Sequence, residues 1–102
     1  MQVIFFSPKI EEYLRSLELP ASTKSFRYIK LLESYGNNLG MPYSKQLSTN
    51  FYELRIRGQQ EVRIFFCFHK NTAVILHAFL KKSQKTPHYE IETALNRIKL
   101  LT

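Results

Sequence analysis

The sequence predicts an α+β fold in which one strand, two helices, three strands and a closing helix follow one another. Three observations support this order: apolar residues recur with a period of two in 52–57 and 62–68, helical spacing appears near both ends of the chain, and two Ser/Thr-Pro steps suit helix starts. Such an order is typical of a small, mainly antiparallel sheet with helices packed on one side. The 102 residues have room for one core, so we treat 1–102 as a single domain.

The first third of the chain is expected to form a short strand and two helices. Residues 2–6 are mostly β-branched or aromatic, and they lead into Ser7-Pro8, an N-cap residue followed by proline at the first helical position. We expect the first helix to end at Pro20 and the second to begin near Ser22 and stop at the first glycine. The apolar residues at helical spacing are Ile10, Tyr13, Leu14 and Leu17 in the first helix, and Phe26, Ile29 and Leu32 in the second.

The middle of the chain is expected to contain the remaining strands. Segment 36–50 is rich in glycine and asparagine and is predicted to be a surface connection. In 52–57 apolar and charged residues alternate, which sends the two sets to opposite faces of a strand. The tetrad 58–61 suits a hairpin loop, and 62–68 continues the alternation. Segment 72–82 is almost continuously apolar before its two final lysines, which indicates a central strand covered on both faces.

A closing helix is predicted after Thr86-Pro87, which repeats the cap-plus-proline signal of Ser7-Pro8. Its apolar stripe consists of Ile91, Ala94, Leu95 and Ile98.

Basic residues dominate the charge of the chain. The formal net charge is +7, and the segment 52–90, with seven basic residues and three glutamates, carries +4 of it. Clustered lysine and arginine on a folded domain favour a nucleic-acid partner over a membrane surface or an acidic protein. The single cysteine, Cys67, lies in an apolar strand pattern and suits a core thiol in a reducing compartment. With no signal-peptide pattern and no apolar run near membrane-span length, we expect a cytoplasmic protein without a membrane partner.

Two groups of basic residues are expected to form one groove. Arg55, Arg57 and Arg63 share a sheet face if the hairpin pairs in register, and guanidinium groups on rigid strands suit phosphate contacts. The second group is at the start of the closing helix, whose free amides also attract anions, and two side chains there could exchange protons or stack on a base. This group comprises Lys81, Lys82 and Lys85 as cations, with His88 and Tyr89 in the first turn.

Structural roles compete with these assignments. The three arginines could form a solvated face with salt bridges to Glu53 or Glu61. His77 lies in an apolar strand, where a hydrogen-bonded structural histidine is more common than a catalyst. The histidines have no cysteine and carboxylate company, and the glycines are scattered, so we predict no metal, cofactor or phosphate loop.

Several motifs occur together in one order: LRIRG, V-R-I-F-F, ILHAFLKK and Q-K-T-P-x-x-E-I-x-x-A-x-x-R. In this combination the chain resembles the RelE/HigB toxin superfamily, especially its phage-derived HigB-like branch. The resemblance implies a RelE-like fold and the toxin of a type II toxin–antitoxin system. Such a toxin is a ribosome-dependent, metal-independent endoribonuclease that cleaves mRNA, and a cognate helix-turn-helix antitoxin neutralises it.

The resemblance also assigns roles to residues of this chain. It implies catalytic positions at Arg55, Arg57, Arg63 and Lys82, with a proton-transfer or stacking residue at His88 or Tyr89, and RNA contacts from Lys81 and Lys85. Glu53 stands where some members have lysine. The general base is therefore left open between Glu53, His88, Tyr89 and a lysine.

Two other functions fit the same scaffold. One is a ParE-like inhibitor of DNA gyrase, and the other is an RNA-binding module without catalysis. ParE-like chains generally lack clustered arginines and a late histidine or tyrosine, so Arg63, Lys82, His88 and Tyr89 weigh against the first alternative.

Overall fold

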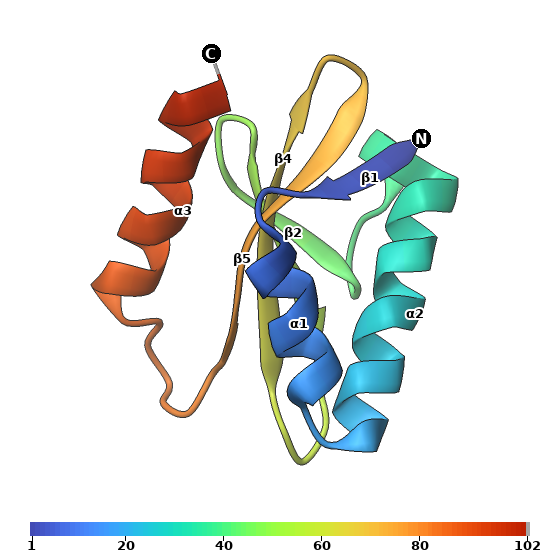
Figure 1. The fold of residues 1–102 in the computed structure, drawn as a ribbon, viewed down its shortest axis with the longest axis vertical. Coiled ribbons are helices and arrows are strands. Elements are labelled where there is room, and N and C mark those ends of the chain that lie inside the picture. Colours follow the sequence, from blue (N-terminus) through green and yellow to red (C-terminus); the bar gives the residue numbers. More distant parts are fainter. Residues whose placement is uncertain (102) are drawn as a thin grey trace.

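A computed structural model describes residues 1–101 and confirms the α+β class (Figure 1). Within these residues, the strands form a single sheet in the order β1-β5-β4-β3-β2, antiparallel throughout except for the parallel pair β1 and β5. The elements in chain order are β1 (Gln2–Phe5), α1 (Pro8–Ser16), α2 (Leu19–Tyr35), the 3-10 turn η1 (Gly36–Asn38), β2 (Ser44–Ser48), β3 (Phe51–Ile56), β4 (Val62–His69), β5 (Thr72–Leu80) and α3 (His88–Leu101).

The helices lie in two layers. Helices α1 and α2 pack on one side of the sheet, whereas α3 lies against the opposite face (Figure 1). The reason is that β4 and β5 carry apolar residues on both faces, as the sequence indicated for β5, and both faces must be covered. The core under α1 and α2 includes Leu14, Leu32, Ile64 and Ile75, and the core under α3 includes Phe65, Cys67, Leu76 and Ala94.

The first helix begins as predicted, but the boundary between the two N-terminal helices was wrong. Ser7 is the N-cap of α1, where its hydroxyl accepts a hydrogen bond of 3.2 Å from the amide of Lys9. However, α1 already ends at Ser16, and Pro20 lies in the first turn of α2. Proline is tolerated there because first-turn amides have no partner within the helix.

The connection predicted for 36–50 contains a further strand. Residues Ser44–Ser48 form β2, one of the two edge strands of the sheet, which pairs with β3. Its sequence, SKQLS, is polar, and only Ser44 is buried, so the hydrophobic period that marks other strands is absent. Exposed, polar edge strands of this kind protect a sheet from pairing with other chains.

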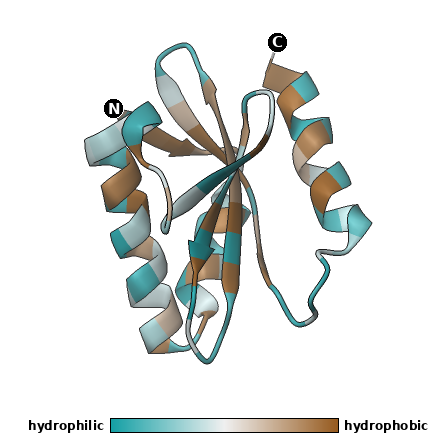
Figure 2. Cartoon of the chain, turned by 180° about the vertical axis from the view of Figure 1, so that it is seen from behind, coloured by the Kyte–Doolittle hydropathy of each residue, from teal (hydrophilic) through white to brown (hydrophobic). Residues whose placement is uncertain are grey.

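The β3–β4 hairpin lies where the sequence predicted it, although its loop begins one residue earlier than the expected tetrad 58–61. The loop 57–61 joins β3 to β4, and Lys70 and Asn71, both with positive φ, form the tight two-residue turn between β4 and β5. Figure 2 shows these turns as hydrophilic, whereas hydrophobic and hydrophilic segments alternate along α2 and α3. α3 begins at His88, one residue later than Pro87, the predicted first helical residue.

Candidate functional site

The strand arginines form a compact ionic group with two glutamates, here called the arginine cluster: Glu53, Arg55, Arg57, Glu61 and Arg63. Arg55 pairs directly with Arg63 across β3 and β4, so these two arginines share a sheet face, as expected for a hairpin that pairs in register. Phe65 lies two residues after Arg63 on β4, and Phe79 pairs with Arg63 across β4 and β5. Both phenylalanines belong to the core under α3. The Arg55 and Arg63 side chains therefore belong to the sheet face that carries α3.

Arg63 is the most deeply buried member of the arginine cluster, with only 2% of its side chain exposed. Its guanidinium donates to the Val62 carbonyl at 3.2 Å and to a Glu61 oxygen at 3.2 Å, and its Nε lies 3.9 Å from a Glu53 oxygen. These contacts match the salt-bridged structural role that competes with phosphate binding at Arg63. Its Nε and that of Arg55 are buried without a hydrogen-bond partner among the described residues.

The two glutamates neutralise part of the positive charge. Glu53 lies 3.3 Å from the Nε of Arg55, and Glu61 lies 3.8 Å from Arg57, which is largely exposed in the loop. Burial raises the pKa of the Glu61 carboxyl, but the hydrogen bonds from the Gly58 amide and Arg63, and the charges of Arg63 and Arg57, outweigh it. The net effect holds the pKa of Glu61 below its ordinary value.

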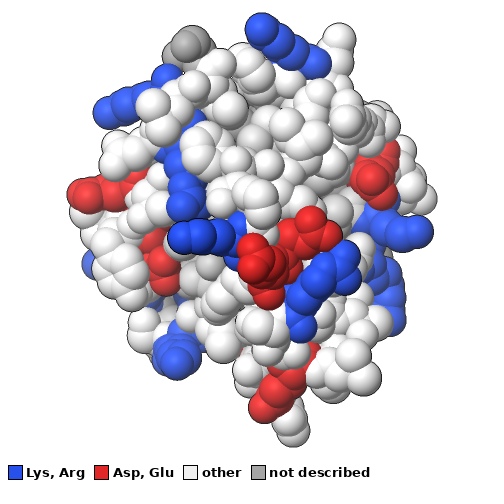
Figure 3. Space-filling view, in the orientation of Figure 1, with Lys and Arg blue, Asp and Glu red and all other residues white. Residues whose placement is uncertain are grey.

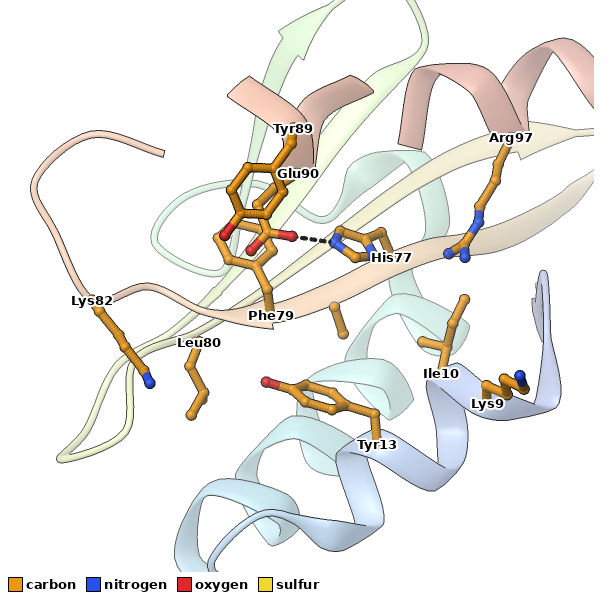
Figure 4. Close-up of a pocket in the computed structure, with 11 residues that line it drawn as sticks. Lys9, Ile10, Tyr13, His77, Phe79, Leu80, Lys82, Tyr89, Glu90 and Arg97 are labelled. Atoms are coloured by element: carbon orange, nitrogen blue, oxygen red, sulfur yellow. Dashed lines mark hydrogen bonds and ion pairs between the residues drawn. The ribbon is translucent and has the colours of Figure 1, made fainter. Parts of the chain in front are cut away.

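A second polar region, here called the edge cleft, opens beside β5. Strand β1 pairs only with Thr72–Ile75, so the second half of β5 has no strand beyond it on that side within residues 1–101. A cleft of about 510 Å³ occupies the space between α1 and α3. Its polar and aromatic lining consists of Lys9, Tyr13, His77, Phe79, Lys82, Tyr89, Glu90 and Arg97 (Figure 4).

A histidine–glutamate pair lies in the edge cleft. His77 Nε2 is 2.6 Å from a Glu90 oxygen, which joins β5 to the first turn of α3 (Figure 4). The imidazole ring stacks on Phe79 at a centroid distance of 5.8 Å. Burial and the negative charge of Glu90 raise the pKa of Tyr13, against a hydrogen bond at the Leu80 backbone that lowers it. Arg97 donates to the Leu76 carbonyl at 2.5 Å, so two polar contacts attach α3 to adjacent residues of β5.

The predicted site residues in the loop before α3 and in its first turn differ in their exposure and hydrogen bonding. The ammonium of Lys81 donates to the Gln84 carbonyl at 2.8 Å, whereas Lys82 and Lys85 are exposed, and Lys82 also lines the edge cleft. His88 is 81% exposed and lies 2.8 Å from Glu92 on its own helix. Tyr89 is 66% exposed and lines the edge cleft.

The arginine cluster and the edge cleft meet at one end of the sheet. Arg63 pairs with Phe79 across β4 and β5, and the Lys81 amide donates to the Glu61 carbonyl at 2.7 Å. The predicted strand cations and the predicted loop and helix residues therefore come from neighbouring elements. On the face in Figure 3, acidic and basic side chains are interspersed, so no single-sign patch covers that face.

The family comparison gives a match along most of the chain. The model of the family Phage derived protein Gp49-like (DUF891) matches residues 12–99. The chain belongs to this family. The Gp49-like family is toxin-like and related to RelE/HigB-type toxins, and it suggests a phage-derived toxin of a toxin–antitoxin pair with an antitoxin partner. No curated protein matches the chain.

Some residues of the edge cleft were missed by sequence reasoning, which singled out Lys82 and Tyr89 but gave His77 only a structural role. Lys9 and Tyr13 come from α1, far away in the sequence, and no local pattern could place them beside α3. Glu90 and Arg97 had a signal, because both are fixed letters of the motif Q-K-T-P-x-x-E-I-x-x-A-x-x-R. The contacts to His77 and Leu76 give these two motif positions of the Gp49-like chain a structural role.

Residues 1–101 contain neither a candidate metal site nor a candidate membrane-spanning helix. No three His, Cys, Asp or Glu side chains come together there in a way that could hold a metal ion. Likewise, none of the helices in this part of the Gp49-like chain has the length and apolar character needed to span a membrane.

Proposed function

We propose that this Gp49-like protein is the toxin of a type II toxin–antitoxin system and that it cleaves mRNA on the ribosome. The match to a toxin-like family over residues 12–99 carries the proposal. The meeting of the arginine cluster with the edge cleft supports it, because cations and proton-transfer groups from separate segments lie at one end of the sheet. In this proposal the toxin acts in the cytoplasm, without a metal or cofactor, and a helix-turn-helix antitoxin neutralises it.

The proposed reaction is attack of a ribose 2′-hydroxyl on the adjacent phosphate. It requires a base for the hydroxyl proton, an acid for the leaving 5′-oxygen and cations for the charge that develops on the phosphate. It also requires the attacking and leaving oxygens to lie in line, which a flexible RNA strand rarely achieves. A ribosome that holds the mRNA supplies this geometry, which explains why a toxin of this kind would depend on translation.

The contacts in the structure support different roles for the proposed cations. Arg57 and Lys82 are exposed, and Arg55 is partly exposed, so these three suit direct contact with phosphates. Arg63 is enclosed by Glu53, Glu61 and the Val62 carbonyl, so we assign it to holding the arginine cluster together.

The other proposed residues extend the site around the start of α3. Lys81 and Lys85 add positive charge in the loop before the helix, where an RNA backbone could pass. Tyr89 faces the edge cleft and suits stacking or proton transfer, and the exposed imidazole of His88 lies one residue before it.

Primer extension on translated transcripts tests the proposed activity. Purified protein, added to a translation reaction with ribosomes, should produce new 5′ ends within codons, and Lys82→Ala should remove most of them and relieve growth arrest in cells. Lys70→Ala is the matched control, because Lys70 lies in the turn at the opposite end of the sheet. A changed DNA supercoiling state with intact mRNA would instead support gyrase inhibition and contradict the proposal.

A further inference from the structure

The base in the proposed reaction is still open, and the edge cleft contains a candidate that differs from His88. Among residues 1–101, the partner of His88 is Glu92 on its own helix, and 81% of the His88 side chain is exposed, so no other element holds it in place. His77 is held between elements, with 19% of its side chain exposed. A proton-transfer histidine is usually fixed by a carboxylate on one ring nitrogen and uses the other nitrogen for chemistry.

We propose that His77, oriented by Glu90, is the general base that accepts the 2′-hydroxyl proton. The inference rests on the proposed function. It starts from the 2.6 Å contact between His77 Nε2 and the Glu90 carboxylate, which fixes the plane and direction of the ring. Stacking on Phe79 at an interplanar angle of 22° restrains the same ring from a second direction.

The second ring nitrogen of His77 stays available. Among the described residues, Nδ1 has no hydrogen-bond partner, and it is not among the side-chain atoms that are buried without one. With Nε2 donating to Glu90, Nδ1 carries a lone pair that can accept a proton. His77 therefore meets the two conditions for an oriented base: one nitrogen is held and the other is free.

The surroundings of His77 suit an RNA linkage. A cleft of about 510 Å³ is within the size range of small-ligand sites. The charged and titratable groups that line the edge cleft with His77 are Lys9 and Tyr13 from α1, Lys82 after β5, and Tyr89, Glu90 and Arg97 from α3. Three cations against one carboxylate leave the edge cleft positive, as a phosphate ligand requires, and the two tyrosines offer rings for base stacking.

The bond changes of the proposed step balance within the edge cleft. His77 Nδ1 takes the proton of the 2′-hydroxyl while that oxygen bonds to phosphorus and the bond from phosphorus to the 5′-oxygen breaks. The leaving oxygen takes a proton from a donor in the same cleft, where Tyr89 and Lys82 each carry one. The products are a 2′,3′-cyclic phosphate and a 5′-hydroxyl, and His77 then releases its proton to water.

Single-turnover cleavage of mRNA in ribosome complexes tests the assignment. We expect His77→Ala to lower the cleavage rate about 100-fold or more, the usual contribution of a general base. Added imidazole should restore part of the lost rate, because it can replace a missing base but not a missing packing contact. His69→Ala is the matched control, since His69 pairs with Thr72 at the far end of the sheet, and it should cleave at the wild-type rate.

A second variant separates orientation from folding. Glu90→Gln keeps an oxygen beside His77 but removes the negative charge. If Glu90 positions His77, we expect this variant to cleave mRNA at a roughly 10-fold lower rate, with a changed pH–rate profile and an unchanged thermal midpoint. A changed pH–rate profile together with a lowered thermal midpoint in Glu90→Gln would make the His77–Glu90 pair structural and overturn the inference. A full cleavage rate in folded His77→Ala would also overturn it. So would a folded but inactive His77→Ala variant that imidazole does not rescue. No cleavage by the wild-type protein would overturn the proposed function itself.

Discussion

The arginine cluster and the edge cleft contain similar numbers of cations, but these cations differ in how they are paired with carboxylates. In the arginine cluster, three arginines face two glutamates at distances between 3.2 and 3.9 Å, and the central guanidinium is buried. In the edge cleft, Lys9, Lys82 and Arg97 line the same space as Glu90, which is itself bonded to His77. A count of basic residues along a sequence therefore overstates how many are free for a ligand, because acidic neighbours on the same strands can bind them first.

The comparison predicts that Arg63 matters mainly for stability. Arg63→Ala would leave the Glu53 and Glu61 carboxylates without their buried partner, and losing one partner of a buried ion pair costs about 3 kcal/mol or more. Urea unfolding should show this loss in the free energy of unfolding. Arg57→Ala, in the exposed loop, is the control and should change stability by less than about 0.5 kcal/mol. Equal stabilities of the two variants would remove the distinction between buried and exposed arginines.

A smaller effect is expected in RNA affinity when one carboxylate is neutralised. Glu61→Gln removes a charge that faces Arg57 and Arg63, so it should tighten non-specific binding to single-stranded RNA by about 5-fold at low salt. Fluorescence anisotropy with a labelled oligonucleotide measures this change. Glu33→Gln changes the net charge equally but lies on α2, away from the arginine cluster, and it should have a much smaller effect. The same increase in both variants would mean that only total charge matters.

The smallest expected effect concerns the pH dependence of stability. The folded-state pKa of Glu61 lies below its ordinary value, so ionised Glu61 stabilises the fold above its unfolded-state pKa. This contribution is lost as the pH falls through the folded-state pKa, in the range of about pH 5 to 3. Thermal midpoints measured across this range should therefore fall less steeply for Glu61→Gln than for the wild type. Parallel curves for the two proteins would contradict the role of the Glu61 contacts.

Much of the fold was predictable because hydrophobic periodicity and helix-start signals are local. The alternation in 52–57 and 62–68 indicated that Arg55 and Arg63 would share a sheet face, and Ser7 marked the start of α1. The polar strand β2 was not predictable in this way, because an exposed edge strand needs no apolar face. The separate position of α3 followed from strands with two apolar faces, a signal that was present in β5.

The candidate site was less predictable, because it depends on contacts between distant segments. Sequence spacing brought the strand arginines together but did not show that Glu53 and Glu61 would enclose Arg63. The apolar surroundings of His77 in the sequence suggested a structural residue, and its hydrogen bond to Glu90 fits that view as well as an orienting role. Tyr13 reaches the edge cleft only because α1 packs beside the unpaired half of β5.

In the described part of the chain, strand β1 pairs with the first half of β5 alone, and this affects association between copies of the protein. A half-strand without a neighbour offers backbone groups to any other chain that can extend alongside it, and this is a common route to aggregation. Here α1 and α3 flank that stretch, Arg97 occupies the Leu76 carbonyl, and Lys9 and Lys82 add mutual repulsion between copies. The charges that make the opening attractive to a polyanion thus also help to keep the protein dispersed.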